Sequence, residues 1–182
     1  MKIYKTNNPQ DFTVLASEFS EERLIIDIAD IACVWTGQLN TYSPEVVRKH
    51  DFVVGQGEYL GGTIVNFPGD LSLCLVTWGN SMPTFGEDCV NIILSMIEGI
   101  KNGNDILVND KKVASWARAT TGSGWVQTVV HFSINIDKDL IKEICIKPMK
   151  KIPGQLSDYN IEATDILNKL NIEELLKQYQ KE

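Results

Sequence analysis

The sequence predicts an α+β domain built on a mixed, mostly antiparallel sheet flanked by helices. After Pro9, apolar residues recur at i, i+3, i+4 and i+7, the pattern of one helix face: Phe12, Leu15, Ala16 and Phe19. Residues 125–136 instead alternate apolar and polar side chains, as a half-buried strand does. The stretch from about residue 161 is helical again. Helices and strands are therefore grouped rather than strictly alternating, which favours α+β over α/β.

The segments between these elements predict further strands and two more helices. Apolar, β-branched runs at residues 24–28 and 31–35 indicate two strands. Ser43-Pro44-Glu45 supplies the N-cap, the proline and the first-turn acid of a short helix. Residues 52–78 have the glycine-punctuated pattern of strands and tight turns. A second amphipathic helix carries its apolar stripe at Val90, Ile93, Leu94 and Ile97.

Composition predicts one domain that covers residues 1–182. The chain is 43% hydrophobic, enough for a substantial core. Its net charge is −7 and it has only three arginines, Arg23, Arg48 and Arg118, so we expect no nucleic-acid partner. Four cysteines without a CxxC pair fit a reducing compartment. With no signal-peptide pattern and no apolar run near about 20 residues, we expect a cytoplasmic protein without a membrane partner.

A predicted hairpin at residues 105–117 carries the most chemistry. Two β-rich runs flank Asn109-Asp110, residue types that tolerate the positive φ of a two-residue turn. In this register Asp105 faces Ala114. Strict alternation then puts an acid, two cations, a small residue and a tryptophan on one face: Asp105, Lys112, Ala114, Trp116 and Arg118. Such a face could bind an anion with an apolar tail, while an ordinary solvated hairpin is the alternative that periodicity leaves open.

Three segments of the chain, in order, resemble the lipoate/biotin protein ligase family. Residues 101–107 and 111–114 (Lys-Asn-Gly-Asn-Asp-Ile-Leu, then Lys-Lys-Val-Ala) resemble the Lys-Trp-Pro-Asn-Asp-(Ile/Leu) … Lys-(Val/Leu)-Ala-Gly segment of biotin protein ligases. Residues 32–42 look like the strand and Gly-x-x-Gln-Asn loop of lipoate–protein ligase A. Residues 61–71 are similar to the Gly-Gly-Gly-Thr-Val-(aromatic)-His-Asp-x-Gly-Asn-Leu segment of that family. The resemblance covers most of residues 8–137 and implies the catalytic-domain fold of these ligases.

The resemblance implies a two-step reaction. The carboxylate of lipoate, or of a similar acyl group, attacks the α-phosphate of ATP in the presence of Mg²⁺ and gives an acyl-adenylate. The acyl group then passes to a lysine of a lipoyl-carrier domain. The implied partner is therefore a carrier protein, and the implied ligands are ATP, Mg²⁺ and the acid.

The matched positions imply roles for individual residues. Lys112 corresponds to the family lysine at the reacting carboxylate and α-phosphate, where a cation stabilises concentrated negative charge. Asn104 and Asp105 correspond to the pair associated with the nucleotide, with Asp105 as the magnesium ligand. The implied acyl pocket combines the glycine strand with two hairpin residues: Gly61, Gly62, Thr63, Ala114 and Trp116.

The sequence also departs from the family pattern. Residues 55–60 (Gly-Gln-Gly-Glu-Tyr-Leu) hold no arginine where the ligases have phosphate-facing ones, and Asn66 stands at the position of a family histidine. We nominate Arg118 as the substitute cation because it shares the predicted face of Lys112. Two hypotheses follow: an active lipoate-type ligase, or a catalytically degenerate member that binds a ligand or a partner protein.

Overall fold

The computed structural model of the protein describes residues 1–38, 40–57, 63–79, 81–147 and 149–179, in which two sheets form the frame. The large sheet has the order β1-β2-β6-β10-β9-β8-β7, and β11 pairs with β9. Its strands are β1 (Lys2–Thr6), β2 (Arg23–Ile28), β6 (Leu71–Trp78), β7 (Ile100–Asn102), β8 (Asp105–Val108), β9 (Lys111–Thr120), β10 (Trp125–Phe132) and β11 (Ile152–Pro153). The small sheet has the order β4-β3-β5, with β3 (Cys33–Thr36), β4 (Val53–Gln56) and β5 (Ile64–Asn66).

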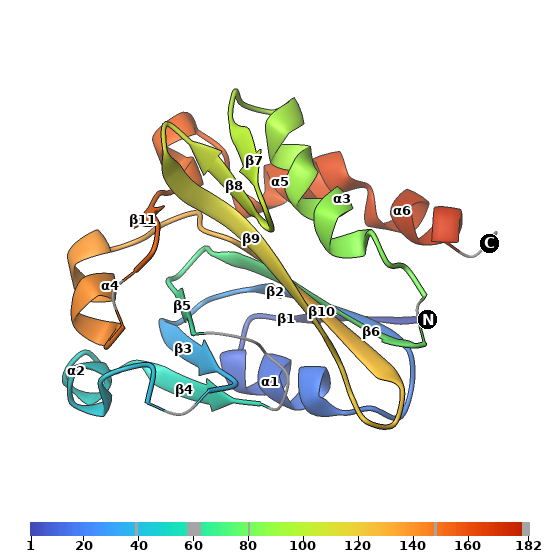
Figure 1. Ribbon diagram of the computed structural model, residues 1–182, viewed down its shortest axis with the longest axis horizontal. Coiled ribbons are helices and arrows are strands. Elements are labelled where there is room, and N and C mark those ends of the chain that lie inside the picture. Colours follow the sequence, from blue (N-terminus) through green and yellow to red (C-terminus); the bar gives the residue numbers. More distant parts are fainter. Residues whose placement is uncertain (39, 58–62, 80, 148, 180–182) are drawn as a thin grey trace.

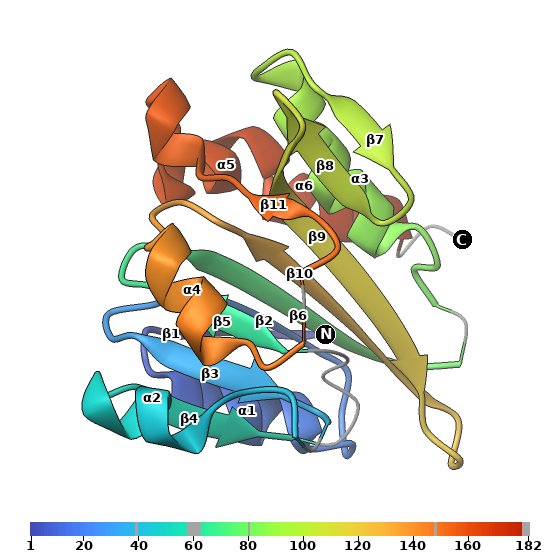
Figure 2. The same ribbon diagram turned by 60° about the vertical axis from the view of Figure 1, so that its left-hand side comes forward.

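Helices cover both sides of the large sheet. On one side lie α3 (Phe85–Asn91), α5 (Ala163–Leu170) and α6 (Ile172–Tyr179), and on the other lie α1 (Pro9–Ser17) and the small sheet (Figure 1). Two further helices, α2 (Pro44–Lys49) and α4 (Lys138–Ile144), flank the small sheet, and α4 lies near β11 and β5 (Figure 2). Among the described strands of the large sheet, the β1–β2 and β11–β9 pairs are parallel and the other pairs are antiparallel. The predicted α+β fold with a mixed, mostly antiparallel sheet is confirmed.

The local predictions hold for most elements and differ at their ends. Ser43 caps α2 by accepting a hydrogen bond from the backbone N–H of Val46. The second amphipathic helix ends at Asn91 and continues as a 3₁₀ helix, η1 (Ile92–Ser95). A second 3₁₀ turn, η2 (Leu156–Tyr159), precedes α5. Within the described residues, no helix is long and apolar enough to cross a membrane.

β10 is buried on both of its faces, whereas its alternating sequence predicted one solvated face. The strand also ends at Phe132, short of the predicted residue 136. Its polar positions Gln127 and His131 are 1% and 6% exposed. The reason is the second layer: α1 and the small sheet cover the face that the alternation assigns to solvent. Polar residues on this strand are therefore interior groups that need partners.

The β8–β9 hairpin forms at the predicted turn but with a different register beyond it. Asn109 and Asp110 have φ of 48° and 61°, as a primed two-residue turn requires. A register shift then inserts one extra residue in β9, so that Asp105 lies opposite Ser115 and not Ala114. The predicted face was wrong for this reason: beyond the bulge, every side chain of β9 points to the side opposite the one that strict alternation gives.

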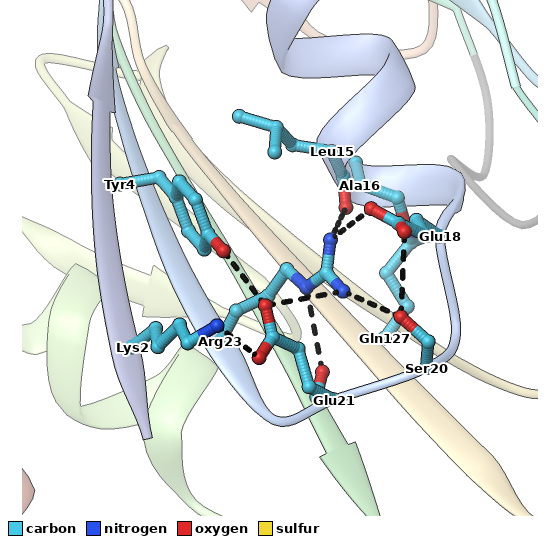
Figure 3. Close-up of polar contacts among 9 residues, drawn as sticks. All are labelled: Lys2, Tyr4, Leu15, Ala16, Glu18, Ser20, Glu21, Arg23 and Gln127. Carbon is cyan, nitrogen blue, oxygen red and sulfur yellow. Dashed lines mark hydrogen bonds and ion pairs between the residues drawn. The ribbon is translucent and has the colours of Figure 1, made fainter.

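Arg23, at the start of β2, fixes the chain between α1 and the large sheet. Its side chain is 1% exposed. It donates to Glu18 Oε2 at 2.6 Å, to Ser20 Oγ at 3.1 Å and to the carbonyl oxygens of Glu21 and Leu15 at 3.4 and 3.5 Å (Figure 3). The buried guanidinium is therefore paired with a carboxylate and hydrogen-bonded on each of its nitrogens, as a buried charge must be.

Candidate functional site

A cavity of about 420 Å³ lies where β5, β8, β9 and β10 meet α4 and β11. Its walls combine polar and charged side chains from the large sheet with apolar ones from the small sheet and α4. The lining residues are Thr63, Ile64, Val65, Asp105, Lys112, Ser115, His131, Ser133, Ile141, Cys145, Met149, Lys150, Lys151 and Pro153. A ligand that fits these walls has one anionic end and one apolar end.

The charged end of the cavity is an acid held between two lysines. Nζ of Lys112 lies 3.2 Å from Oδ1 of Asp105, and Nζ of Lys151 lies 2.5 Å from Oδ2. Lys151 also donates to the carbonyl oxygen of Asn102 at 3.2 Å. The side chains of Lys112 and Lys151 are 39% and 27% exposed, so both ammonium groups remain accessible from the cavity. Two cations share one carboxylate, which leaves an excess of positive charge.

β11 brings Lys151 to this place. Ile152 and Pro153 pair in parallel with Lys111 and Lys112 of β9, and the N–H of Gly154 donates to the carbonyl oxygen of Lys112 at 2.8 Å. A Cβ on Gly154 would lie 2.7 Å from Cβ of Lys111, so only glycine allows this close approach. Residues 149–154 thus run along the edge of the cavity, directly beside Lys112.

His131 forms the neutral floor of the cavity. Its Nδ1 shares a hydrogen bond of 3.1 Å with Ser72 Oγ, and its Nε2 lies 3.4 Å from Ser133 Oγ. Burial, together with the nearby Lys112 ammonium group, lowers the pKa of His131 to about 3. The imidazole is therefore uncharged at neutral pH. It can exchange hydrogen bonds with a ligand but adds no positive charge.

His131 belongs to a row of polar residues that crosses the large sheet. The residues that lie directly opposite one another on successive strands are Asp27, Ser72, His131, Ser115 and Asp105. The row begins inside the protein and ends in the cavity. Asp27 is fully buried, and neither carboxylate oxygen has a hydrogen-bond partner. Burial, and to a lesser extent the charge of Asp30, raises its pKa to about 7.

The apolar end of the cavity lies between β5 and α4. Val65 and Ile141 contribute to one hydrophobic core cluster there, and Cys145 packs against it. Burial raises the pKa of the Cys145 thiol, so this cysteine contributes apolar surface and no thiolate near pH 7. Thr63, next along the wall, is hydrogen-bonded to Thr41.

Of the predicted site residues that the structure describes, three meet in the cavity. Lys112, Asp105 and Thr63 line it together, whereas Asn104 lies outside it, exposed in the turn between β7 and β8. Gly61 and Gly62, predicted for the acyl pocket, lie outside the described residues.

The bulge in β9 removes three further residues from the predicted site. Ala114 is buried in the core beneath α3, and the ring of Trp116 packs against Gly86 of that helix. Arg118 donates to the carbonyl oxygen of Met82 at 3.2 Å on the same side of the sheet. The expectation that these side chains share the face of Lys112 is wrong, because the extra residue reverses the alternation after Val113.

Sequence reasoning missed the contribution of residues 145–153. Lys150-Lys151-Ile152-Pro153-Gly154 could have indicated a basic turn, but its partner strand lies some 40 residues earlier in the sequence. Ser115, His131 and Ser133 were missed because the predicted register and exposure placed them elsewhere. No local pattern connects these residues to Lys112.

The described residues form no ready-made cluster of ligands for Mg²⁺, which in nucleotide sites is commonly held by one or two carboxylates together with substrate phosphates. Each oxygen of Asp105, the predicted ligand, already accepts from an ammonium group. Within the described ranges, no group of three or more His, Cys, Asp or Glu side chains is placed to hold a metal ion. In this structure the Asp105 carboxylate is therefore engaged by two lysines and not by a metal-binding cluster.

Solved structures with the same fold include lipoate ligases. LipL1 of P. falciparum, in complex with lipoate, superposes with a TM-score of 0.73 at 16% identity, over 100% of this chain and 61% of that one. A bi-partite lipoate protein ligase from T. acidophilum, solved in a study with its E2 lipoyl domain, gives 0.72 at 15% identity over 93% and 79%. Lipoate-protein ligase A bound with ATP gives 0.69 at 17% identity over 93% and 81%.

These likenesses show the lipoate/biotin ligase catalytic-domain fold for this chain. No protein-family model and no curated protein matches the sequence itself. The chain spans 61% of the length of the P. falciparum protein.

Proposed function

We propose that the protein is an ATP-dependent ligase of lipoate–protein ligase type, which activates lipoate or a similar acid as its adenylate. The observation that carries this proposal is the division of one cavity into a cationic end, with Lys112 beside Asp105, and an apolar end at Val65 and Ile141. An acyl-adenylate has the same division: a phosphate and carbonyl at one end and a hydrocarbon tail at the other.

The chemistry that this cavity supports proceeds in two steps. A carboxylate oxygen of the acid attacks the α-phosphorus of ATP, a new P–O bond forms, and the bond to the β-phosphate oxygen breaks to release pyrophosphate. The neutral amine of the carrier lysine then attacks the acyl carbonyl, AMP leaves with the bonding electrons, the nitrogen loses one proton to solvent, and an amide remains. We assign Lys112 to the place where both steps concentrate negative charge, because a fixed cation there lowers their barriers.

The comparisons support a lipoate-like acid and a lipoyl-domain acceptor for this proposal. One protein of the same fold is solved with lipoate, a second with ATP, and a third was studied with its E2 lipoyl domain. Because sequence identities are 15–17%, the fold is shared and the activity is our inference. The apolar walls of the cavity agree with an acyl chain, whose burial contributes to binding.

Release of pyrophosphate tests the proposal. Purified protein is incubated with ATP, Mg²⁺ and, in separate reactions, lipoate, octanoate or biotin. We expect release with lipoate or octanoate and little with biotin. Mass spectrometry of an added lipoyl domain should then show the acyl group on its lysine. A lipoyl domain with that lysine changed to arginine is the matched control, because it can receive nothing.

The second candidate function is a binding module that has lost catalysis. One observation favours it: residues 55–60 contain no cation, whereas the ligases have arginines at the corresponding positions. In that case the cavity binds lipoate or an adenylate, but no pyrophosphate appears with any acid. Ligand binding without pyrophosphate release would establish this alternative. If the protein neither binds a ligand nor releases pyrophosphate, both the ligase and the binding module are excluded.

A further inference from the structure

We propose that Lys151 supplies the second cation for the phosphate of the adenylate and takes the place of the arginines that residues 55–60 lack. This inference rests on the proposed function and names a residue from a different part of the chain. The arginines would have come from the stretch of sequence at residues 55–60. Lys151 comes instead from the segment between α4 and β11.

The charge geometry at Asp105 supports a phosphate site. One carboxylate accepts from two ammonium groups, one on each oxygen, at 3.2 and 2.5 Å. Asp105 is 18% exposed, and the two lysines flank it at the mouth of the cavity. Two ammonium groups that flank one carboxylate can bind two oxygens of an incoming anion. The carboxylate keeps both ammonium groups in place until that anion arrives.

The position of Lys151 is built into the backbone. Ile152 and Pro153 pair with β9, and Gly154 approaches Lys111 so closely that any side chain there would clash. Because these contacts begin one residue after Lys151, its Cα cannot drift away from Lys112. An ordinary surface lysine lacks such a restraint, and its side-chain entropy weakens any ion pair that it forms.

Other cations of the chain are placed less well for this role. Arg118 lies on the opposite face of the sheet, and Lys101 pairs with Glu87. His131 is neutral near pH 7 because burial lowers its pKa. Among the described residues that line the cavity, the remaining cations are Lys112, Lys150 and Lys151, and Lys150 is exposed. Lys151 is therefore the best-placed partner for Lys112.

Calorimetric titration of two ligands into four proteins tests this inference. The ligands are lipoate, which has only a carboxylate, and a non-hydrolysable lipoyl-adenylate analogue that keeps the anionic phosphorus group. The proteins are the wild type, Lys151→Ala, Lys151→Arg and Lys147→Ala. Lys147 is the matched control because it is exposed in the same segment and does not line the cavity. Lys151→Gln keeps the side-chain length and replaces the alanine variant if that variant fails to fold.

We expect Lys151→Ala to weaken binding of the analogue about tenfold or more, which corresponds to about 1.4 kcal/mol. Lipoate should bind within about twofold of wild type, because the cation serves the phosphate. Lys151→Arg should keep most of the affinity, and Lys147→Ala all of it.

Three results would overturn the inference and leave the proposed function standing. The first is that Lys151→Ala binds the analogue as tightly as wild type does. The second is that Lys151→Ala loses the same affinity for lipoate as for the analogue, and the third is that Lys151→Arg loses as much affinity for the analogue as the alanine variant. If the wild type binds neither ligand, the proposed function fails, and the role of Lys151 fails with it.

Discussion

Two clusters of charged side chains in this protein are built in opposite ways. Around Arg23 one guanidinium is 1% exposed, and its hydrogen bonds all end on groups of the same chain (Figure 3). Around Asp105 two ammonium groups are 39% and 27% exposed, and they share one carboxylate at a cavity. The charge of the first cluster is paired within the protein. In the second cluster two ammonium groups share one carboxylate, so positive charge remains for a ligand.

The difference shows how a structural charge can be separated from a functional one. A buried charge contributes to folding only when it is paired and hydrogen-bonded inside the protein. A charge that serves a ligand must keep a donor directed toward solvent, and its pairing with neighbours must be exchangeable. Arg23 meets the first condition, and Lys112 and Lys151 meet the second. Substitutions in the two clusters should therefore affect different properties: stability in one case and binding or turnover in the other.

Arg23→Ala should cause the largest loss, in stability. Removal of the buried side chain leaves a cavity, and the carbonyl oxygens of Leu15 and Glu21 lose a donor. We expect the free energy of unfolding to fall by about 3–5 kcal/mol, measured by urea denaturation. Arg23→Lys should also be clearly destabilised, since an ammonium group cannot form the same fork. A fully stable Arg23→Ala would mean that the network is dispensable.

Lys112→Ala should abolish activity and spare the fold. We expect pyrophosphate release to fall by about 10²–10³-fold, because one preorganised charge at the reacting centre is lost. The melting temperature should change little, since the side chain is 39% exposed. Lys111→Ala is the matched control: it is the neighbouring residue of β9, does not line the cavity, and should behave as wild type. Equal losses from both substitutions would contradict the observed register of the hairpin.

Asp27→Asn should reveal a buried charge that has no partner, in contrast to Arg23. The pKa of Asp27 is raised from 3.8 to about 7, so between these values the folded state holds a proton that the unfolded state has lost. The stability that the folded state gains by keeping this carboxyl protonated is therefore fully present below about pH 4. It is lost as the pH rises through about 7 and the buried carboxyl becomes charged. The variant should be more stable than wild type by about 2–3 kcal/mol at pH 8 and similar to it at pH 4.

Denaturant unfolding of wild type and Asp27→Asn across this pH range is the measurement. Asp11→Asn, an exposed acid of α1, is the control and should leave the pH profile unchanged. Parallel profiles for wild type and Asp27→Asn would show that the buried carboxyl has a partner in solution.

Gly154→Ala should cause a smaller loss of stability than Arg23→Ala. It should change the cavity by moving Lys151, without removing a charge. The added methyl group would meet Cβ of Lys111 at 2.7 Å, so β11 must shift away from β9 and carry Lys151 with it. We expect about 1–2 kcal/mol of lost stability. Binding of the adenylate analogue should weaken in parallel with Lys151→Ala. If analogue binding is normal while stability falls, the position of β11 does not matter to the ligand.

Much of this fold was accessible from local sequence. The spacing of Phe12 and Ala16 predicted a buried helix face, and both residues are fully buried. Asn109-Asp110 predicted the hairpin turn, because the two residue types tolerate positive φ without help from the rest of the chain. The sequence also predicted that Asp105 and Lys112 share one face of the hairpin, and the structure shows their side chains forming an ion pair.

Only the tertiary structure decided the rest of the site. The bulge at Val113 moves Arg118 to the far side of the sheet, where its side chain donates to the carbonyl oxygen of Met82. The burial of His131 depends on segments distant in sequence, because β5 and α4 form the walls of the cavity that His131 lines. Lys151 reaches Asp105 across 46 residues of sequence, through a parallel pairing between strands that no local pattern predicts. Local sequence determines conformations within a turn or a helix, whereas contacts between distant segments depend on the packing of the whole domain.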